Sequence, residues 1–120
     1  MEPVRSFRDL RVWQAAVALQ HEVSRVVAAW PAEDAFLADQ MRRAARSVHA
    51  NVAEGNGKAS RRDYLRFLAV SRGSLQELEA DVASLRGATT PTSPEDVELL
   101  ARSIRNVGRL LAALIRSLGR

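Results

Sequence analysis

The sequence predicts an all-α protein, an antiparallel up-down-up-down four-helix bundle formed by one domain over residues 1–120. Three observations lead to this fold class. Apolar residues recur at alternating spacings of four and three in three long segments, which is the period of helices that pack against one another. Proline, glycine and capping residues separate these segments, and no stretch alternates with the period of two that a strand requires. Short connections between long helices favour antiparallel neighbours.

The first two helices are predicted at about 9–30 and 34–54. Pro31 ends the first, because proline cannot continue a helix and restricts the residue before it. Gly55 and Gly57 suit a left-handed cap at the end of the second. The first apolar stripe consists of Val12, Ala16, Leu19, Val23, Val26 and Trp30, and the weaker second stripe consists of Leu37, Met41, Ala44, Val48 and Val52.

The other two helices are predicted at about 61–86 and 94–118. Ser60 and Asp63 read as a capping box at the start of the third helix. Gly87 interrupts the chain, and Ser93 with Pro94 supplies an N-cap and a first-turn proline for the fourth. The third stripe contains one polar member and consists of Tyr64, Leu68, Ser71, Leu75, Leu78, Val82 and Leu85. The fourth is wholly apolar and consists of Val97, Leu100, Ile104, Val107, Leu111, Leu114 and Leu118.

The composition narrows the classes of function. The chain has no cysteine, so disulfides, thiolate metal sites and thiol nucleophiles are excluded. No apolar run approaches the ~20 residues of a membrane span, and the N-terminus lacks the apolar core of a signal peptide. We therefore expect a cytoplasmic protein without a membrane partner.

The net charge of +4 is strongly segregated along the chain. Residues 1–39 sum to −2, residues 40–72 to +6, residues 73–98 to −5 and residues 99–120 to +5. The +6 segment holds seven arginines and one lysine against two acids. Such blocks predict contact between subunits or with a polyanion.

The glycine-rich stretch after the second helix is not a phosphate-binding loop. Gly57-Lys58 has Val52 where a Walker-type loop needs glycine, and Ala59 where it needs serine or threonine. The two histidines, at 21 and 49, do not follow a glutamate by three residues, so the bundle lacks the ligand pattern of a di-iron site. We expect no catalytic residues, no metal and no cofactor.

Several residues point to structural roles. Glu54 is expected to be partly buried in the last turn of the second helix, and a proton-handling role is the alternative. A buried carboxylate needs a partner, for which Arg43, Arg62, Arg66 and the Trp13 indole are the candidates. Asn51 is expected to bond its own helical turn. Trp13 is expected to anchor the core, and Gly73 to permit close approach of another helix, inside the chain or from another subunit.

The candidate nucleic-acid-binding residues all lie in the +6 segment. Its helices and the turn between them would present a surface that neutralises phosphates, giving salt-sensitive and sequence-tolerant binding. Arg43 and Arg72 are left out, because they are candidates to pair with Glu54 or Glu77. His49 shares a helix face with two of the chosen arginines. The chosen residues are Arg42, Arg46, Lys58, Arg61, Arg62 and Arg66. A scaffold that binds another protein, without nucleic acid, is the alternative.

A family resemblance is carried by three segments: FRDLRVWQAAVAL, QMRRAARSVHANVAEGNGKASRRDYLRFL and SRGSLQELEADV. They resemble bacterial four-helix bundle proteins found in intervening sequences of large-subunit ribosomal RNA genes. The accessory variability determinant of diversity-generating retroelements belongs to the same superfamily. The matching motif residues include Trp13, Asn51, Glu54, Gly55, Arg72, Gly73 and Glu77, whereas His49 stands where relatives often carry proline.

The resemblance implies a homopentamer with a basic surface and no known catalytic activity. It also implies RNA or DNA, or a reverse transcriptase, as partners, because the retroelement members bind both. The sequence adds its own indication of a homo-oligomer, since Leu10, Val17 and Val27 lie off the main seam of the first helix.

Overall fold

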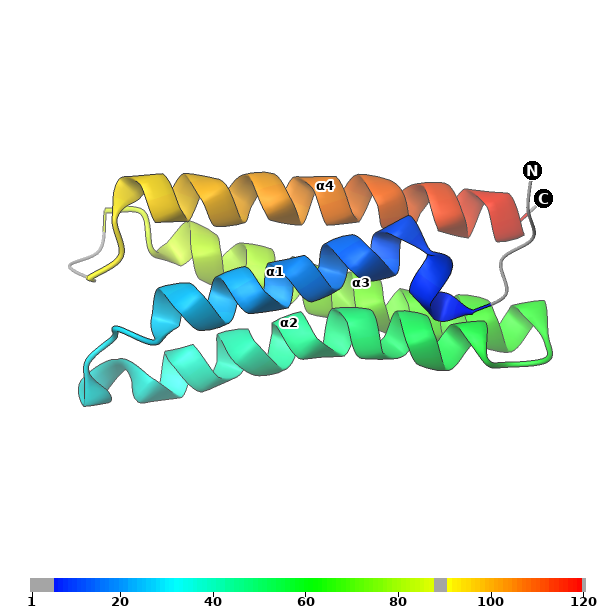
Figure 1. Ribbon diagram of the computed structural model, residues 1–120, viewed down its shortest axis with the longest axis horizontal. Helices are drawn as coiled ribbons and strands as arrows, with labels where there is room; N and C mark the ends of the chain where they lie inside the picture. Colours follow the sequence, from blue (N-terminus) through cyan, green and yellow to red (C-terminus); the bar gives the residue numbers. More distant parts are fainter. Residues whose placement is uncertain (1–5, 88–90, 120) are drawn as a thin grey trace.

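The computed structural model describes residues 6–87 and 91–119, and within them the protein is all-α without a strand. Four long helices, α1 (Arg11–Val27), α2 (Ala35–Asn56), α3 (Arg61–Ser84) and α4 (Pro94–Leu118), form the fold, with short 3-10 helices η1 (Phe7–Asp9) and η2 (Ala32–Asp34) before α1 and α2. The predicted all-α class with four helices is confirmed. The chain in Figure 1 reverses direction after each helix, which is consistent with the predicted antiparallel order.

The helix boundaries agree with prediction at α4 and differ elsewhere. The first helix was expected to span residues 9–30, but α1 ends at Val27, since Pro31 keeps the residues before it from completing the last turn. At the other end Leu10 is extended, with φ −76° and ψ 125°, so the chain breaks between η1 and α1. The third helix ends two residues early, and Gly87 follows it with φ +75°.

The second helix ends two residues later than predicted, because it does not end in a left-handed glycine. Gly57 is the C-cap, with φ −81° and ψ −3°, and Gly55 lies inside the helix. The predicted left-handed cap is therefore wrong. Gly55 serves close packing instead: a Cβ built there would lie 2.9 Å from Tyr64 Cδ1 and 3.0 Å from Phe67 Cβ. The absence of a side chain lets the end of α2 pack directly on the start of α3.

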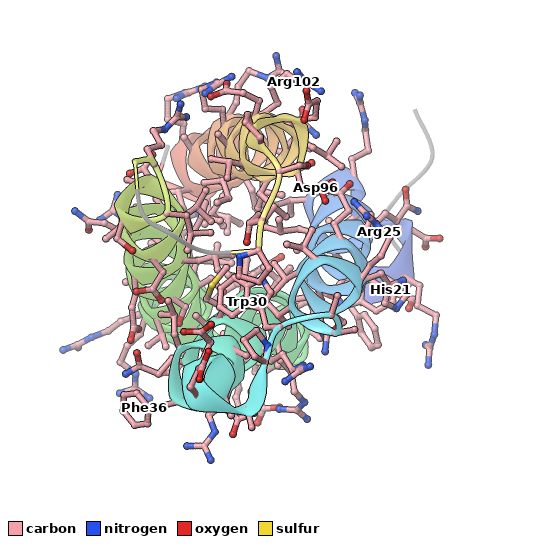
Figure 2. All side chains as sticks on the ribbon, turned by 90° about the vertical axis from the view of Figure 1, so that its left-hand side faces the viewer. His21, Arg25, Trp30, Phe36, Asp96 and Arg102 are labelled. Atoms are coloured by element: carbon pink, nitrogen blue, oxygen red, sulfur yellow. The ribbon has the colours of Figure 1, made fainter. Side chains whose placement is uncertain are left out.

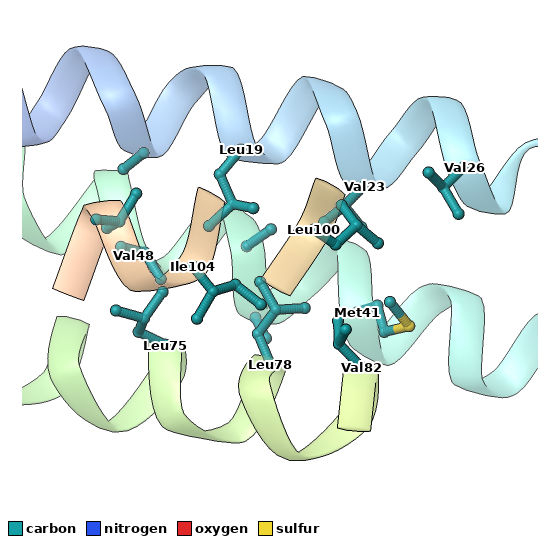
Figure 3. Close-up of a cluster of buried hydrophobic side chains, with 14 of the residues drawn as sticks. Leu19, Val23, Val26, Met41, Val48, Leu75, Leu78, Val82, Leu100 and Ile104 are labelled. Atoms are coloured by element: carbon teal, nitrogen blue, oxygen red, sulfur yellow. The ribbon is translucent and has the colours of Figure 1, made fainter. Parts of the chain in front are cut away.

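The core is a continuous apolar cluster to which all four helices contribute (Figure 3). The predicted stripes supply it, as Leu19, Met41, Leu78 and Leu100 each bury their side chain completely. Ser71, the polar member of the third stripe, is also fully buried and donates a hydrogen bond to the Val48 carbonyl at 2.8 Å. That bond satisfies the hydroxyl without water and ties α3 to α2.

The predicted N-caps are present. Ser60 Oγ accepts from the backbone N–H of Asp63 at 3.1 Å, and Ser93 Oγ accepts from that of Asp96 at the same distance. The loop before α4 is also held by Trp30, whose Nε1 donates to Thr92 Oγ1 at 2.9 Å. Viewed along the bundle in Figure 2, Trp30 closes this end of the core. The two serine caps therefore fix the first residues of α3 and α4.

Candidate nucleic-acid interface

The candidate arginines of α2 lie one and two turns before His49, which contacts α1. His49, one turn after Arg46, hydrogen-bonds Gln20 of α1 through Nε2 and lies edge-on to Trp13, with ring centroids 6.3 Å apart. His49 is therefore a half-buried contact between α1 and α2 rather than a solvated member of an arginine ridge. Burial, followed by the charges of Arg46 and His21, lowers the pKa of His49. The neutral imidazole is the favoured form there.

Arg42 and Arg46 differ in burial and in ion pairing. Arg42 is partly buried and pairs with Asp39 at 3.3 Å. Arg46 is exposed, and within the described residues its guanidinium forms no ion pair. Arg46 is thus the stronger of the two as a phosphate ligand.

The other four candidates gather around the turn between α2 and α3 and are all exposed. Lys58 pairs with Glu54 at 3.6 Å and lies 5.1 Å from the centroid of the Phe67 ring. Arg66 pairs with Asp63 at 3.4 Å. Surface pairs of this kind contribute about 0–1 kcal/mol and exchange readily with solvent or with a stronger anion. Lys58, Arg61, Arg62 and Arg66 are called the turn group below.

The six candidates form two groups rather than one patch. Arg46 lies ten residues before the end of α2, which places it about 15 Å along the helix from the turn group. Arg62 and Arg66, in contrast, belong to the first turns of α3. A ligand must span about 15 Å to contact both groups. A nucleic-acid strand, with a phosphate every ~3.4 Å, is long enough to do so.

Two expectations about ion pairs in the fold are wrong. Glu54 was expected to be partly buried, but 61% of its side chain is exposed and its partner is Lys58, not Arg43, Arg62, Arg66 or Trp13. The residues next to it in sequence are apolar, but they point to other sides of the helix. Arg43 and Arg72 were expected to pair with Glu54 or Glu77, yet within the described residues neither guanidinium forms an ion pair. Both arginines are exposed and add to the basic surface.

Asn51 and Trp13 hold helices together as predicted. Asn51 Nδ2 donates to the Ser47 carbonyl at 2.9 Å, bonding its own helix turn. The Ser47 hydroxyl in turn bonds that of Ser74 on α3 at 2.7 Å, so a polar chain links the two helices. Trp13 packs against the core and meets the Phe7 ring edge-on, with centroids 5.1 Å apart.

Sequence reasoning missed two exposed apolar side chains, one on α2 and one on α3. Phe36 is 77% exposed and Val70 is 49% exposed, although both lie in helices whose other large apolar residues face the core. Figure 2 shows Phe36 pointing away from the bundle. Gly73 is exposed as well, with nothing within 4 Å of a Cβ built there, so it makes no close contact inside this chain. The Ser47–Ser74 hydrogen bond sets the register of α2 and α3, and it places Phe36 about 20 Å along the bundle from Val70 and Gly73. These two separate exposed positions, Phe36 and the pair Val70 and Gly73, are together called the α2–α3 outer face below.

The exposure of Val70 and Gly73 could have been predicted from their positions in the sequence. Val70 and Gly73 lie three residues apart, and both fall between members of the buried stripe of α3. The three residues of the first helix that indicated extra apolar surface are not fully exposed. Val27 is buried in the bundle, whereas Leu10 and Val17 are half-buried.

Two classes of site have no support in the described part of the chain. There, no three His, Asp or Glu side chains gather in a way that could hold a metal ion. No helix is long and apolar enough to span a bilayer. What remains as candidate chemistry is recognition by exposed guanidinium groups.

Fold and site together define a four-helix bundle protein with an arginine-rich surface. Residues 8–113 match the family described as 23S rRNA-intervening sequence protein, and the chain belongs to that family. The resemblance inferred from the three sequence segments is thereby confirmed.

The solved structures contain a protein of the same fold. It is a protein of unknown function from the S23 ribosomal protein family of Bacteroides thetaiotaomicron VPI-5482, with a TM-score of 0.77 and 18% sequence identity, over 87% of this chain and 97% of that one. Likeness at this identity shows the fold alone. Among curated proteins there is no match.

Proposed function

We propose that this protein is a non-enzymatic homo-oligomer that binds RNA or DNA through an arginine-rich surface, without strict sequence readout. The observation that carries the proposal is that the +6 charge of residues 40–72 stays at the surface. Seven of its eight cations are exposed and the eighth, Arg42, is partly so. Guanidinium groups suit this task because they bind phosphate oxygens in a bidentate fork.

The expected mode of binding is electrostatic. Each phosphate that a cation neutralises releases condensed counterions, so affinity falls steeply with salt and depends little on sequence. The ion pairs of Lys58 and Arg66 are local and exposed, and a phosphate can replace the carboxylate at little cost. In an oligomer the same surface is present in several copies, and contacts that are individually weak add through avidity.

The test uses two double variants with the same change in net charge. Arg46→Gln with Arg62→Gln removes one unpaired cation from each group, whereas Arg25→Gln with Arg86→Gln removes two that pair with Asp96 and Glu98 of α4. Fluorescence anisotropy at about 50 mM salt, with structured RNA and with duplex DNA, measures the affinity. We expect the first variant to weaken binding to every sequence alike, and the control to retain near wild-type affinity. Equal weakening by both variants would show that only overall charge matters and would reject this surface.

We further propose that the α2–α3 outer face mediates self-association, as a pentamer by analogy with the resemblance described above. Large exposed apolar side chains such as Phe36 are typical of interaction sites, and Gly73 leaves room for a close neighbour. Sedimentation equilibrium tests this: Phe36→Ser with Val70→Ser should shift the protein toward its 13.2 kDa subunit without lowering the thermal stability of that subunit. A wild-type protein that sediments only as that subunit would refute self-association.

The second candidate function is a scaffold that binds another protein, such as a reverse transcriptase, without contacting nucleic acid. The exposure of Phe36 favours this alternative, because the same face could receive such a partner. The two functions separate in one assay. If the intact oligomer binds neither structured RNA nor duplex DNA at about 50 mM salt, the scaffold function is the one that remains.

A further inference from the structure

Helix α4 carries a second basic surface that the candidate residues do not include. After Glu98 the helix contains no acid, and its four arginines, Arg102, Arg105, Arg109 and Arg116, are all exposed. At 3.6 residues per turn, these four positions fall within an arc of about 60°. They form one ridge, called the α4 ridge below, and Figure 2 shows Arg102 projecting from α4 on the side away from α2.

The charges of the α4 ridge are not neutralised within the fold. In the part of the chain that the structure describes, no carboxylate lies within 4.0 Å of any of the four guanidinium groups. Arg109 donates a hydrogen bond to the neutral Asn106 side chain at 2.6 Å. The acids of α4 sit in its first turns, where Asp96 and Glu98 pair with Arg25 and Arg86.

The helix dipole does not account for this arrangement. Cations are favoured near the C-terminus of a helix, but the effect falls off within the last turn. Arg116 lies in that turn, whereas Arg102, Arg105 and Arg109 lie in the middle of α4. Three like charges on one side of a helix repel one another, so an anion from outside would stabilise them.

A hollow beside the ridge extends the basic surface onto α3. Arg105 and Arg72 both line this space of about 320 Å³ between the two helices, with Leu75 and Ile104 among its apolar lining. Glu79 also lines it and is its one acid. Gly108, which lacks a side chain, also lines the hollow. Two exposed guanidinium groups, one from each helix, can thus approach a single anionic chain.

We propose that the α4 ridge, with Arg72, binds the sugar–phosphate backbone of a nucleic-acid duplex as a site separate from the turn group. The ridge from Arg102 to Arg116 is about 21 Å long, at 1.5 Å per residue. One strand of a duplex presents a phosphate every ~3.4 Å along the axis, so about six phosphates pass along a ridge of this length. This inference rests on the proposed function and adds a surface to it.

The ligand class follows from the side chains around the ridge. Helix α4 contains no aromatic residue, so it offers bases no stacking platform, and single-strand binding by stacking is disfavoured. An anionic membrane is the other extended array of phosphates. Binding at a membrane surface uses an apolar helix face that inserts beside the cations. The apolar face of α4 is already buried in the bundle, and it consists of Val97, Leu100, Ile104, Val107 and Leu111. A duplex backbone needs only the ridge.

The position of the ridge leaves it accessible in an assembly. The α2–α3 outer face lies on other helices, and Arg66 of the turn group is one turn from Val70 on that face. Self-association through the face would therefore cover part of the surface beside Arg66 and leave α4 open to solvent. The α4 ridge of each subunit then stays available to a duplex in an assembly.

The experiment compares Arg105→Gln with Arg109→Gln against Arg62→Gln with Arg66→Gln, which removes the same charge from the turn group. Glutamine keeps the helix propensity of arginine, so folding is retained, as circular dichroism will check. Binding of the full-length protein to duplex RNA, duplex DNA and vesicles of anionic lipid is measured over a range of salt. We expect the α4 double variant to weaken both duplexes and to flatten the slope of log K against log salt by about 1.8, at ~0.9 per phosphate contact.

Two more variants and three possible outcomes decide the inference. Arg105→Lys with Arg109→Lys should restore most of the slope, because lysine keeps the charge, and Glu79→Gln should strengthen binding by removing the acid beside Arg105. An α4 double variant with wild-type slope, while the turn-group variant is impaired, would overturn this inference and leave the proposed function intact. A wild-type protein that binds neither duplex would overturn both, as would vesicle binding alone that depends on Arg105 and Arg109.

Discussion

Replacing Gly55 by alanine tests how closely α2 and α3 pack. In an ordinary helix interior, Gly→Ala stabilises a protein by about 1 kcal/mol, because it removes backbone freedom from the unfolded chain. Gly55 has helical backbone angles and is buried, so it would gain that amount. However, the new methyl group would lie 2.9 Å from Tyr64 Cδ1, 3.0 Å from Phe67 Cβ and 3.3 Å from the Tyr64 carbonyl oxygen.

Two of these three atoms cannot move by rotating a flexible side chain. The Phe67 Cβ and the Tyr64 carbonyl are fixed to the backbone of α3, so the helices must separate by several tenths of an ångström. Overpacking of this kind costs about 1–3 kcal/mol. It would also strain the hydrogen bond from Asn56 Nδ2 to the Tyr64 hydroxyl, which is 3.0 Å long. We expect Gly55→Ala to destabilise the protein by up to about 2 kcal/mol net, after the helical gain of about 1 kcal/mol is subtracted.

Thermal unfolding by circular dichroism measures the effect, with Gly108→Ala as the matched control. At Gly108 the nearest atom to a new Cβ is Leu75 Cδ2 at 3.5 Å, an ordinary contact with the end of a flexible side chain. The control should raise Tm by about 3–6 °C, whereas Gly55→Ala should lower it, by up to about twice that amount. Equal stabilisation by both substitutions would refute close packing of the helices at Gly55.

Three further predictions address other contacts. Gly73→Ala should stabilise the isolated subunit by about 1 kcal/mol, because a Cβ there meets nothing within 4 Å, yet should weaken self-association in sedimentation equilibrium; unchanged association would remove Gly73 from the interface. Ser71→Ala should cost about 0.5–1.5 kcal/mol in chemical denaturation, through loss of the buried bond to the Val48 carbonyl, and a neutral result would mean that the bond contributes nothing net. Burial, Arg46 and His21 lower the pKa of His49, so below its unfolded pKa of about 6.5 the unfolded chain binds more protons. The contribution of His49 to the free energy of unfolding should be fully present above that pH and decline as the pH falls through the folded pKa. His49→Gln should flatten this decline in urea titrations from pH 7 to 5. An unchanged profile would mean that another group titrates.

Much of the fold could be predicted because it depends on features that recur along the chain. The apolar stripes identified the core residues, since a 3.5-residue period keeps one side of each helix against its neighbours. The caps at Ser60 and Ser93 were likewise readable, because a serine hydroxyl at that position satisfies a free backbone N–H. Gly55 was read wrongly because a glycine near a helix end suits a left-handed cap and a close helix contact equally well. Only the position of Tyr64 and Phe67 in space decides between them.

The site was less predictable, because sequence does not show which charges pair. Lys58 and Arg66 looked like free cations but have acids one turn away, whereas Arg43 and Arg72 were expected to pair and do not. The charge of a segment also does not show which side of the bundle each side chain faces. Arg46 and Arg62 lie in the same +6 segment, yet Arg46 lies in the middle of α2 and Arg62 in the first turn of α3. The α4 arginines form a single ridge, and their uniform exposure became clear only once the apolar side of α4 was placed in the core.

The measurement that tests the central claim most directly is the salt dependence of duplex binding by the wild-type protein. A duplex of about 20 base pairs is long enough to run the length of the α4 ridge, and anisotropy between about 50 and 200 mM salt gives the slope of log K against log salt. The four arginines of the ridge alone predict a slope of about −3.6, and contacts by the turn group would make it steeper. Affinity that is unmeasurable at the lowest salt, or a slope near zero, would contradict the claim that this protein binds nucleic acid through its exposed arginines.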